Sequence, residues 1–192
     1  MEAQPQKNNA LSSFIDYVEL FVIAICAVIV LFSLAFRTCT VDGSSMNNTL
    51  VNVEVLLVSD VMYSPDRGDI IVFHHTDDTL SAQRNKPLVK RVIGLGGDTV
   101  KINYKTWEVT VTDKDGNTFN LDEDYVYLSD KPSAFFGIKE YKVPEGSLFV
   151  MGDNRNDSLD SRYSTIGYVD ARSVLGKVMF RVAPLSKFGT VN

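Results

Sequence analysis

Cysteine and histidine are scarce in this sequence, with two residues of each among 192. Two cysteines cannot build a disulfide framework or a four-thiolate zinc site. Cys26 and Cys39 would lie about 20 Å apart on a continuous helix, whereas the Cα atoms of a disulfide lie within about 7 Å. The histidines His74 and His75 are adjacent, and neighbouring side chains of a strand point to opposite faces. We therefore expect no metal, no cofactor and no mechanism that needs several separated histidines.

A basic excess is also missing, since the chain has 19 Lys and Arg residues, 24 Asp and Glu residues and a net charge of -5. No cluster of five or more Lys and Arg residues occurs, so the charge pattern of a nucleic-acid-binding protein is absent. Apolar residues make up 45% of the chain and charged residues 22%, which excludes disorder and a collagen-like fibre. The length allows one ordinary domain and an appendage.

One long hydrophobic run, LFVIAICAVIVLFSLAF over 20–36, contains no charged residue, Pro or Gly. As a helix it spans roughly 25 Å, slightly less than a hydrocarbon core of about 30 Å. Tyr17 and Val18 can extend it if Glu19 lies at the membrane interface. A buried core helix and a cleavable signal sequence are the alternatives, but the following FRTCTVDG offers no convincing small-x-small cleavage site. We therefore expect an uncleaved membrane anchor.

The run divides the chain into three predicted parts: a short N-terminal segment over 1–15, a transmembrane helix over 16–37 and a domain over 38–192. Positive charges flanking a membrane helix set its orientation. Here Lys7 precedes the helix and Arg37 follows it, so the charges leave the orientation open.

Beyond residue 37, short β-rich runs alternate with segments rich in Gly, Pro, Asp and Asn. The segment TWEVTVTDKDGNTFNL predicts a hairpin closed through Asp115 and Gly116. No ten-residue stretch has a good helical period, so we expect a mainly β, antiparallel sandwich or barrel-like catalytic domain preceded by one transmembrane helix. The acidic segment over 121–130 is expected to be a solvated loop. The predicted strand runs are 53–58, 69–73, 88–95, 106–112, 147–151 and 174–182.

Two serines follow a glycine shortly after the hydrophobic run, in VDGSSMNNTL over 41–50. A nucleophilic serine needs an exposed position on a tight turn and backbone N–H groups that can face an oxyanion. Gly43 allows such a turn, and Ser45 would lie at its lip. Taken alone, however, the pattern favours a plain Asx or Ser/Thr turn that links the anchor to the domain.

A lysine lies among apolar residues in LVKRVIG over 88–94, where strand alternation puts Lys90 on the same face as Leu88 and Val92. Desolvation disfavours an ammonium ion, so a buried lysine has a lowered pKa and can act as a general base near neutral pH. Arg91 lies on the opposite face and would serve the structure. Taken alone, an isolated strand lysine is more typical of an edge charge that blocks aggregation.

The loop GDNRNDSLDSR over 152–162 follows an apolar strand and is typical of a rigid, charge-paired loop. Asp160 with Arg162, and Asp153 with Arg155, could form hydrogen-bonded ion pairs that support a site. A plain surface loop and a calcium loop of EF-hand type are the alternatives. The Glu that such a calcium loop requires at its twelfth position is missing.

Together, in this order, the segments resemble the bacterial type I signal peptidases, the membrane-bound serine–lysine endopeptidases of the S26 family. GSSMNNTL over 43–50 resembles their nucleophile box G-x-S-M-x-P-T-L, and RGDIIVF over 67–73 resembles R-G-D-[IV]-V-V-F. KRVIGLGGD over 90–98 resembles the general-base box K-R-V-I-G-L-P-G-D, and residues 152–162 resemble G-D-N-R-x-x-S-x-D-S-R. The single anchor and the absence of large insertions resemble the compact Gram-positive form.

The resemblance implies roles that composition leaves open. Ser45 maps to the nucleophile, Lys90 to the general base, and Ser158 to the serine that hydrogen-bonds the base. The backbone N–H of Ser45 is implied to bind the oxyanion, with Gly43 and Met46 next to the substrate. The residues implied to support the site are Arg91, Asp153, Asp160 and Arg162.

The sequence departs from the family pattern at two prolines, which are replaced by Asn48 and Gly96. Each replacement loses a backbone φ fixed near -65°, so we expect looser loop rims but no lost catalytic atom. At Gly43 some relatives carry a serine whose hydroxyl helps to hold the oxyanion. Glycine leaves that task to backbone N–H groups.

The implied function is removal of N-terminal signal peptides from exported preproteins through an acyl-enzyme. Its implied partners are preproteins with small-x-small cleavage sites and the lipid bilayer, without nucleic acid. The implied topology has a cytoplasmic N-terminus and an extracytoplasmic catalytic domain. A self-cleaving serine–lysine peptidase of the repressor type is a second interpretation, against which the anchor and the 152–162 loop argue. A membrane-tethered binding or scaffold protein with an inert dyad is a third.

Overall fold

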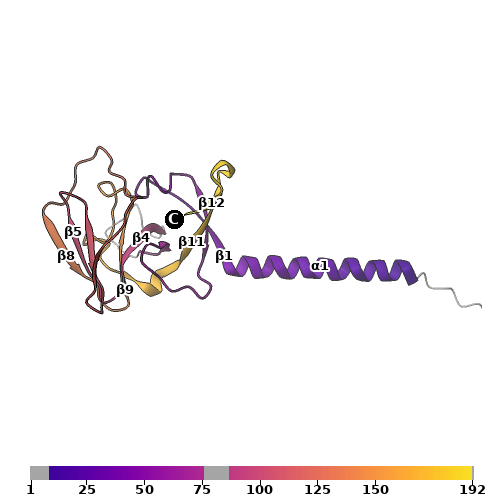
Figure 1. Cartoon of the computed structure of the whole chain (residues 1–192). Helices are drawn as coiled ribbons and strands as arrows, with labels where there is room; N and C mark the ends of the chain where they lie inside the picture. The colour runs from indigo at the N-terminus through magenta and orange to yellow at the C-terminus, as the bar shows by residue number, and fades with distance from the viewer. Residues whose placement is uncertain (1–8, 76–86, 192) are drawn as a thin grey trace, which may run out of the picture. The chain divides into compact units, whose positions relative to one another are not determined.

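The computed structural model describes residues 9–75 and 87–191, and the chain divides into two units between Arg37 and Thr38. The first unit contains the helix α1 (Asn9–Ala35). The second contains the strands and two short 3-10 helices, drawn in Figure 1.

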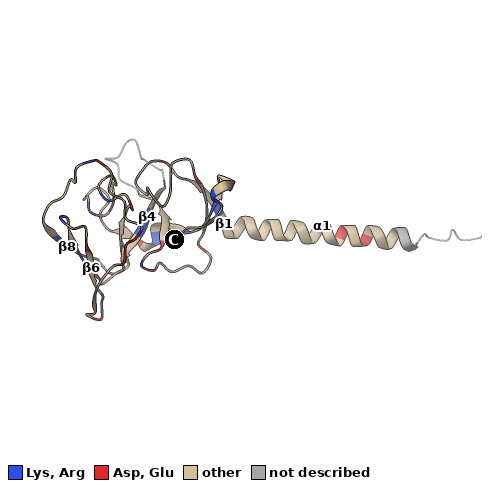
Figure 2. Ribbon diagram, turned by 45° about the horizontal axis from the view of Figure 1, so that its top comes forward, with Lys and Arg blue, Asp and Glu red and all other residues tan. Residues whose placement is uncertain are grey.

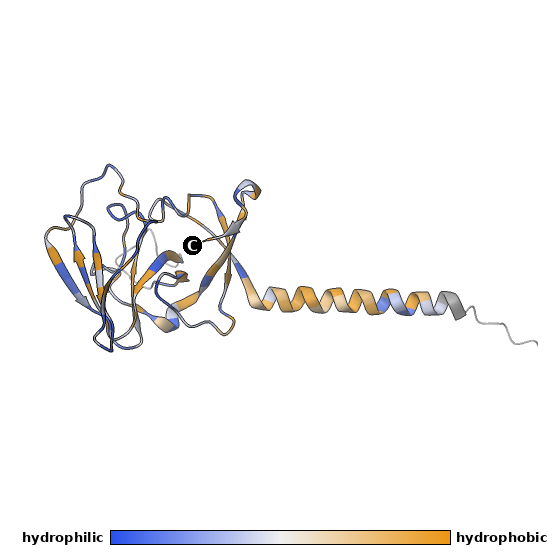
Figure 3. Cartoon of the chain, viewed as in Figure 1, coloured by the Kyte–Doolittle hydropathy of each residue, from blue (hydrophilic) through white to orange (hydrophobic). Residues whose placement is uncertain are grey.

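Helix α1 is long and apolar enough to cross a membrane over Ser12–Ala35, a stretch of 24 residues. These residues span about 36 Å as a helix, which is longer than the hydrocarbon core of about 30 Å. The apolar run over 20–36 alone is shorter than that core. None of this stretch is buried against the rest of the chain. Its described charged residues, Asp16 and Glu19, lie toward the N-terminal end (Figures 2 and 3). The helix is therefore consistent with membrane anchoring.

The second unit is built from two sheets. The larger follows the order β1-β2-β11-β3-β4-β9-β10, with β12 paired to β11, and the smaller follows β7-β6-β5-β8. The strands are β1 (Phe36–Thr40), β2 (Val55–Ser59), β3 (Ile70–Phe73), β4 (Leu88–Gly94), β5 (Thr99–Asn103), β6 (Val109–Thr112), β7 (Thr118–Asn120), β8 (Ile138–Lys142), β9 (Ser147–Met151), β10 (Val169–Asp170), β11 (Val174–Ala183) and β12 (Gly189–Thr190). The 3-10 helices are η1 (Ala171–Ser173) and η2 (Leu185–Lys187).

The predicted mainly β, antiparallel fold is confirmed, because the paired strands β2 to β12 run antiparallel throughout. All six predicted strand runs contain a strand, and β6 and β7 form the predicted hairpin with Thr112 opposite Thr118. Strands β1, β5, β8, β10 and β12 were not predicted. Strand β5 (TVKIN) alternates apolar with polar residues over only five positions, and β8 (IKEYK) has three charged residues without alternation, so neither can be distinguished from polar loop sequence.

The segment that carries Ser45 contains no strand, yet the core fixes it at both ends. The side chains of Met46 and Leu50 have exposed fractions of 1% and 0%, and both pack in one cluster with Val89 of β4. Backbone hydrogen bonds link Val41 to Glu54 across the base of the segment. Burial of the two apolar side chains thus holds the loop against β4.

Candidate active site

The turn before Ser45 is shaped by Gly43 and by contacts with the 152–162 loop. Gly43 has a φ of 110°, a conformation that glycine adopts without strain, and its N–H donates to Asn52 Oδ1 at 2.9 Å. The N–H of Asn154 donates to the carbonyl of Ser45 at 3.0 Å, and the Asn154 amide donates to the carbonyl of Ser44 at 3.1 Å. Within the described residues the N–H of Ser45 donates to no acceptor. The turn therefore presents a free backbone donor beside the Ser45 hydroxyl.

Lys90 lies in the middle of β4 and its exposed fraction is 3%. Its Nζ donates to Ser45 Oγ at 2.7 Å and to its neighbour's carbonyl, Val89 O, at 2.9 Å. Burial disfavours the ammonium form and lowers the pKa of Lys90 to about 8, even though the carboxylates of Asp160 and Asp153 oppose the shift. A serine hydroxyl and a lysine amine 45 residues apart in sequence thus share one hydrogen bond.

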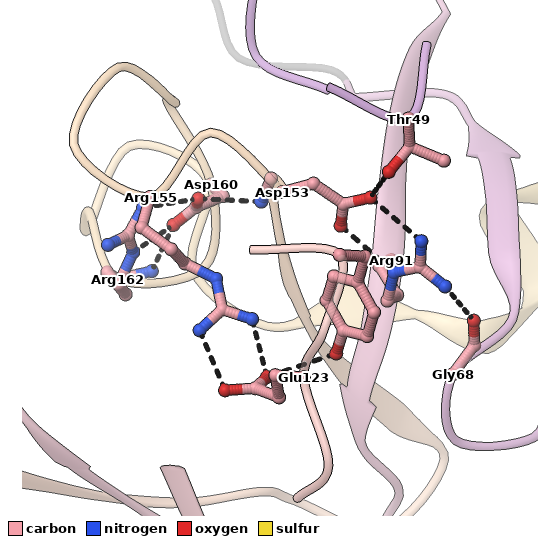
Figure 4. A network of polar contacts seen from close by, with 10 residues as sticks. Thr49, Gly68, Arg91, Glu123, Asp153, Arg155, Asp160 and Arg162 are labelled. Carbon is pink, nitrogen blue, oxygen red and sulfur yellow. Dashed lines mark hydrogen bonds and ion pairs between the residues drawn. The ribbon is translucent and has the colours of Figure 1, made fainter. Parts of the chain in front are cut away.

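Asp153 pairs with Arg91 and not with Arg155, so that sequence prediction was wrong. The Arg91 guanidinium donates to both Asp153 oxygens, at 2.9 and 2.8 Å, and to the carbonyl of Gly68 at 2.9 Å (Figure 4). Thr49 also donates to Asp153, at 2.5 Å. Thr49 lies just after the turn that carries Ser45, and Arg91 lies next to Lys90 in β4. The Asp153 carboxylate therefore links the Ser45 loop to the strand that carries Lys90.

Arg155 binds the acidic segment over 121–130, which was predicted to be a solvated loop. Its guanidinium donates to both oxygens of Glu123, at 3.0 and 2.5 Å, with side-chain exposed fractions of 0% and 9% (Figure 4). The ring of Tyr125 lies 3.7 Å from the Arg91 guanidinium carbon. The prediction of a solvated loop is therefore wrong for Glu123 and Tyr125. They pack against Arg155 and Arg91, because buried guanidinium groups need partners.

Asp160 and Arg162 form the predicted ion pair, with Nε–Oδ1 and Nη2–Oδ2 distances of 2.7 Å and no exposed surface on either side chain. Burial raises the pKa of the Asp160 carboxyl, but the charge and hydrogen bonds of Arg162, with the contributions of Gly152 and Ser158, together outweigh it, so the pKa lies below its usual value. The N–H of Gly152 donates to Asp160 Oδ2 at 3.0 Å. The pair therefore fixes the start of the 152–162 loop.

Ser158 does not form the hydrogen bond to Lys90 that was expected. Its hydroxyl is buried and has no hydrogen-bond partner of good geometry among the described residues, although it lies close enough to Asp160 to help lower the pKa of that carboxyl. Gly152 explains part of this arrangement. A Cβ at that position would lie 2.3 Å from Ser158 Oγ and 2.4 Å from the carbonyl of Ser45, so only glycine fits between them.

A cavity of about 250 Å³ lies beside Ser45 and Lys90, within the second unit. The first half of β4, Leu88–Lys90, pairs with β3, whereas its pairing with β9 begins only at Arg91. Within the described residues this half-strand therefore keeps one open edge. The cavity is lined by Thr40, Val41, Asp42, Gly43, Ser44, Ser45, Met46, Pro87, Leu88, Val89, Lys90, Asp157 and Leu159.

The two positions that depart from the family prolines differ in their surroundings. Asn48 is exposed in the loop after Met46. Gly96 is packed so closely that a Cβ would lie 2.9 Å from Gly146 N and 3.1 Å from Glu145 Cα. A glycine at 96 is therefore required by the approach of the 144–146 turn in this chain.

The chain is similar to known proteins over most of its length. The model of the family "Signal peptidase, peptidase S26" matches residues 14–183. The chain belongs to this signal peptidase family. It is 36% identical to signal peptidase I of Bacillus caldolyticus over 86% of this chain and 90% of that protein. It is 32% identical to signal peptidase I of Bacillus licheniformis over 96% of each chain, and 36% identical to signal peptidase IB of Staphylococcus aureus (strain COL) over 78% of each.

Membership of the signal peptidase family confirms the predicted activity, that of a serine peptidase that removes signal peptides from secreted preproteins. Sequence reasoning found the Ser45 and Lys90 positions but missed three that the structure brings to the site: Thr49, Glu123 and Tyr125. The only available signal was that Thr49 lies within the nucleophile box. Nothing in the acidic segment marks Glu123 as a partner of a distant arginine.

Proposed function

We propose that Ser45 is the nucleophile and Lys90 the general base of this signal peptidase. The observation that carries the proposal is the 2.7 Å hydrogen bond from Lys90 Nζ to Ser45 Oγ, because a general base must lie within hydrogen-bond reach of the proton it takes. The lowered pKa of Lys90, about 8, leaves part of the amine neutral at physiological pH. A neutral amine beside a hydroxyl is the arrangement that activates a serine.

In the reaction, neutral Lys90 takes the proton of Ser45 as Oγ attacks the carbonyl of the scissile bond. The N–H of Ser45, which is free among the described residues, stabilises the oxyanion; loss of one such donor typically costs about 10²–10³ in rate. Lys90 returns the proton to the leaving amine, which gives an acyl-enzyme on Ser45. A water molecule, deprotonated by Lys90, then releases the acyl group and restores the Ser45 hydroxyl.

The supporting roles belong to two buried ion pairs, Arg91–Asp153 and Asp160–Arg162. Each pair carries no net charge, and burial of Lys90 lowers the pKa of its amine by more than Asp160 and Asp153 raise it. Ser158 is assigned a packing role beside Gly152.

The substrate is a preprotein with small residues at the first and third positions before the cut. The open edge of β4 over Leu88–Lys90 offers main-chain hydrogen bonds to an extended segment. The adjoining cavity of about 250 Å³ is smaller than the roughly 300–1,000 Å³ of typical ligand sites and must hold the backbone of that segment as well as its side chains. We further propose that residues 1–15 are cytoplasmic and 16–37 span the membrane, with an extracytoplasmic catalytic domain over 38–192.

The test of specificity uses the full chain in liposomes and a preprotein with an Ala-x-Ala site. Cleavage after the second Ala is expected, and replacing either Ala by Phe should lower kcat/KM at least about 100-fold, because the ring would compete with the substrate backbone for the space of the cavity. Product N-terminal sequencing locates the cut. Equal cleavage of the Phe substrates contradicts the proposed specificity.

Incubation of the chain without substrate tests the self-cleaving alternative, and an inactive wild-type protein supports the scaffold alternative.

The general-base role predicts a particular pH dependence. Only neutral Lys90 can take the proton, so kcat/KM should fall about tenfold per pH unit below the pKa of about 8 and level off above it. An unburied lysine would instead keep the rate rising to about pH 10. The measurement is the pH profile of kcat/KM for the Ala-x-Ala substrate from pH 6 to 10.5. A rate that is flat below pH 8 excludes Lys90 as the base.

A further inference from the structure

The Arg162 guanidinium is buried beneath two aromatic side chains, Trp107 and Phe135. Two of its nitrogens bind Asp160, whereas Nη1 is buried and has no hydrogen-bond partner among the described residues. The rings of Trp107 and Phe135 lie 5.7 and 5.5 Å from its central carbon, a distance at which an aromatic face attracts a cation. Both rings are only partly buried, whereas the Arg162 side chain has no exposed surface. The two rings thus help to separate the guanidinium from solvent.

The smaller sheet fixes these two rings. Tyr104, which is buried in the core of that sheet, stacks on Phe135 at 5.1 Å and packs edge-on against Trp107 at 5.5 Å. Tyr163, next to Arg162 in the chain, packs edge-on against Phe135 at 4.8 Å. Because each ring has an aromatic neighbour in a favourable geometry, the two rings over Arg162 have a defined position.

A short chain of contacts leads from these two rings to the nucleophile. Arg162 holds Asp160 through two hydrogen bonds, and Asp160 Oδ2 accepts the N–H of Gly152. Gly152 in turn lies against the carbonyl of Ser45, where even a Cβ would not fit. A shift of the Arg162–Asp160 pair therefore moves the backbone that packs against Ser45.

We propose that Trp107 and Phe135 are positioning residues of the active site, which keep water from the Arg162–Asp160 pair and so hold Gly152 against the nucleophile turn. This inference rests on the proposed roles of Ser45 and Lys90. Trp107 lies in the connection between β5 and β6 and Phe135 in the loop before β8, so both adjoin the smaller sheet, which the catalytic mechanism does not otherwise use.

Loss of a ring has a definite effect on Lys90. The charged groups that act on its amine are Asp160, Asp153 and Arg162. The other titratable groups around the buried pair are Tyr104, Tyr141 and Lys139. Water that enters beside Arg162 weakens its hold on Asp160 and leaves that carboxylate less neutralised. This change raises the pKa of Lys90.

The test compares Trp107→Leu and Phe135→Leu with the wild type, as full chains in detergent micelles, by the pH profile of kcat/KM. The acid limb is expected to move to higher pH by at least half a unit, which lowers kcat/KM at pH 7 about threefold or more. The loss should fall on kcat, because the substrate cavity is unchanged. Trp107→Phe keeps an aromatic face over Arg162, so its acid limb is expected to lie within about 0.2 pH unit of the wild-type limb.

Val111→Ala is the matched control, because Val111 is fully buried in the same core cluster as Tyr104 but is not one of the two rings over Arg162. This variant should lower the melting temperature without moving the acid limb of the pH profile of kcat/KM. If both leucine variants lower the melting temperature yet keep the wild-type limb, the positioning role is overturned; if Trp107→Leu does not fold, Phe135→Leu alone decides. Cleavage by Ser45→Ala would instead refute the proposed dyad, so the two failures are distinguishable.

Discussion

Replacement of Ser45 by Ala is expected to lower kcat/KM for an Ala-x-Ala preprotein at least about 10³-fold. The change removes the oxygen that attacks the carbonyl and leaves the turn, held by the buried Met46 side chain, in place. Lys90→Met should cause a comparable loss, since methionine fills the buried space without an amine. Because it removes a desolvated amine from the core, Lys90→Met should leave the melting temperature unchanged or slightly raised. Single-turnover cleavage and thermal unfolding measure the two quantities.

Ser44→Ala is the control for this experiment. The hydroxyl of Ser44 donates to Asp157 at 2.8 Å and not to Lys90, so its loss should leave kcat/KM within about fivefold of the wild type. Replacement by Ala is thus expected to lower kcat/KM strongly at Ser45 and only slightly at the neighbouring Ser44. Cleavage by folded Ser45→Ala at more than about a tenth of the wild-type rate would contradict the nucleophile assignment, as would complete loss of activity in folded Ser44→Ala.

Arg91→Met is expected to destabilise the protein by about 3–5 kcal/mol, because it leaves the buried carboxylate of Asp153 without its cation. The side-chain exposed fractions of the pair are 4% and 0%. For a chain of this size the cost corresponds to a fall of roughly 10 °C in melting temperature. The double variant Arg91→Met, Asp153→Asn should recover at least about 1 kcal/mol, since its buried amide carries no charge. Urea or thermal unfolding in detergent measures both changes.

The exposed pair Arg172–Asp170 provides the comparison for Arg91, since its side-chain exposed fractions are 90% and 46%. Arg172→Met breaks an ion pair of similar length in solvent and should change the melting temperature by no more than about 2–3 °C. Equal melting temperatures of Arg91→Met and Arg172→Met would show that burial of the Arg91–Asp153 pair contributes little to stability.

The buried charges around the site are arranged as matched pairs, and this arrangement explains how a lysine can be the base. Arg91 with Asp153 and Arg162 with Asp160 each sum to zero charge. Burial of Lys90 then outweighs the two carboxylates, and the pKa of its amine is lowered to about 8. An unpaired carboxylate at either position would stabilise the ammonium ion instead and abolish the base.

The sequence by itself determined the parts of this protein that depend on local pattern. An uninterrupted apolar run identified the N-terminal helix, and short apolar runs bounded by turn formers located strands such as β3 and β9. Ordered boxes identified the family, and within them Ser45 and Lys90. The hydrogen bond that joins these two side chains follows the expectation from that resemblance.

Only the tertiary structure decided which charges pair. Asp153 lies two residues from Arg155 but binds Arg91, 62 residues away, because the strands bring β4 beside the end of β9. Arg155 instead binds Glu123 of the acidic segment. A buried ion takes whichever opposite charge the packing brings within hydrogen-bond distance, and proximity in sequence carries little information about that distance once the chain has folded into sheets.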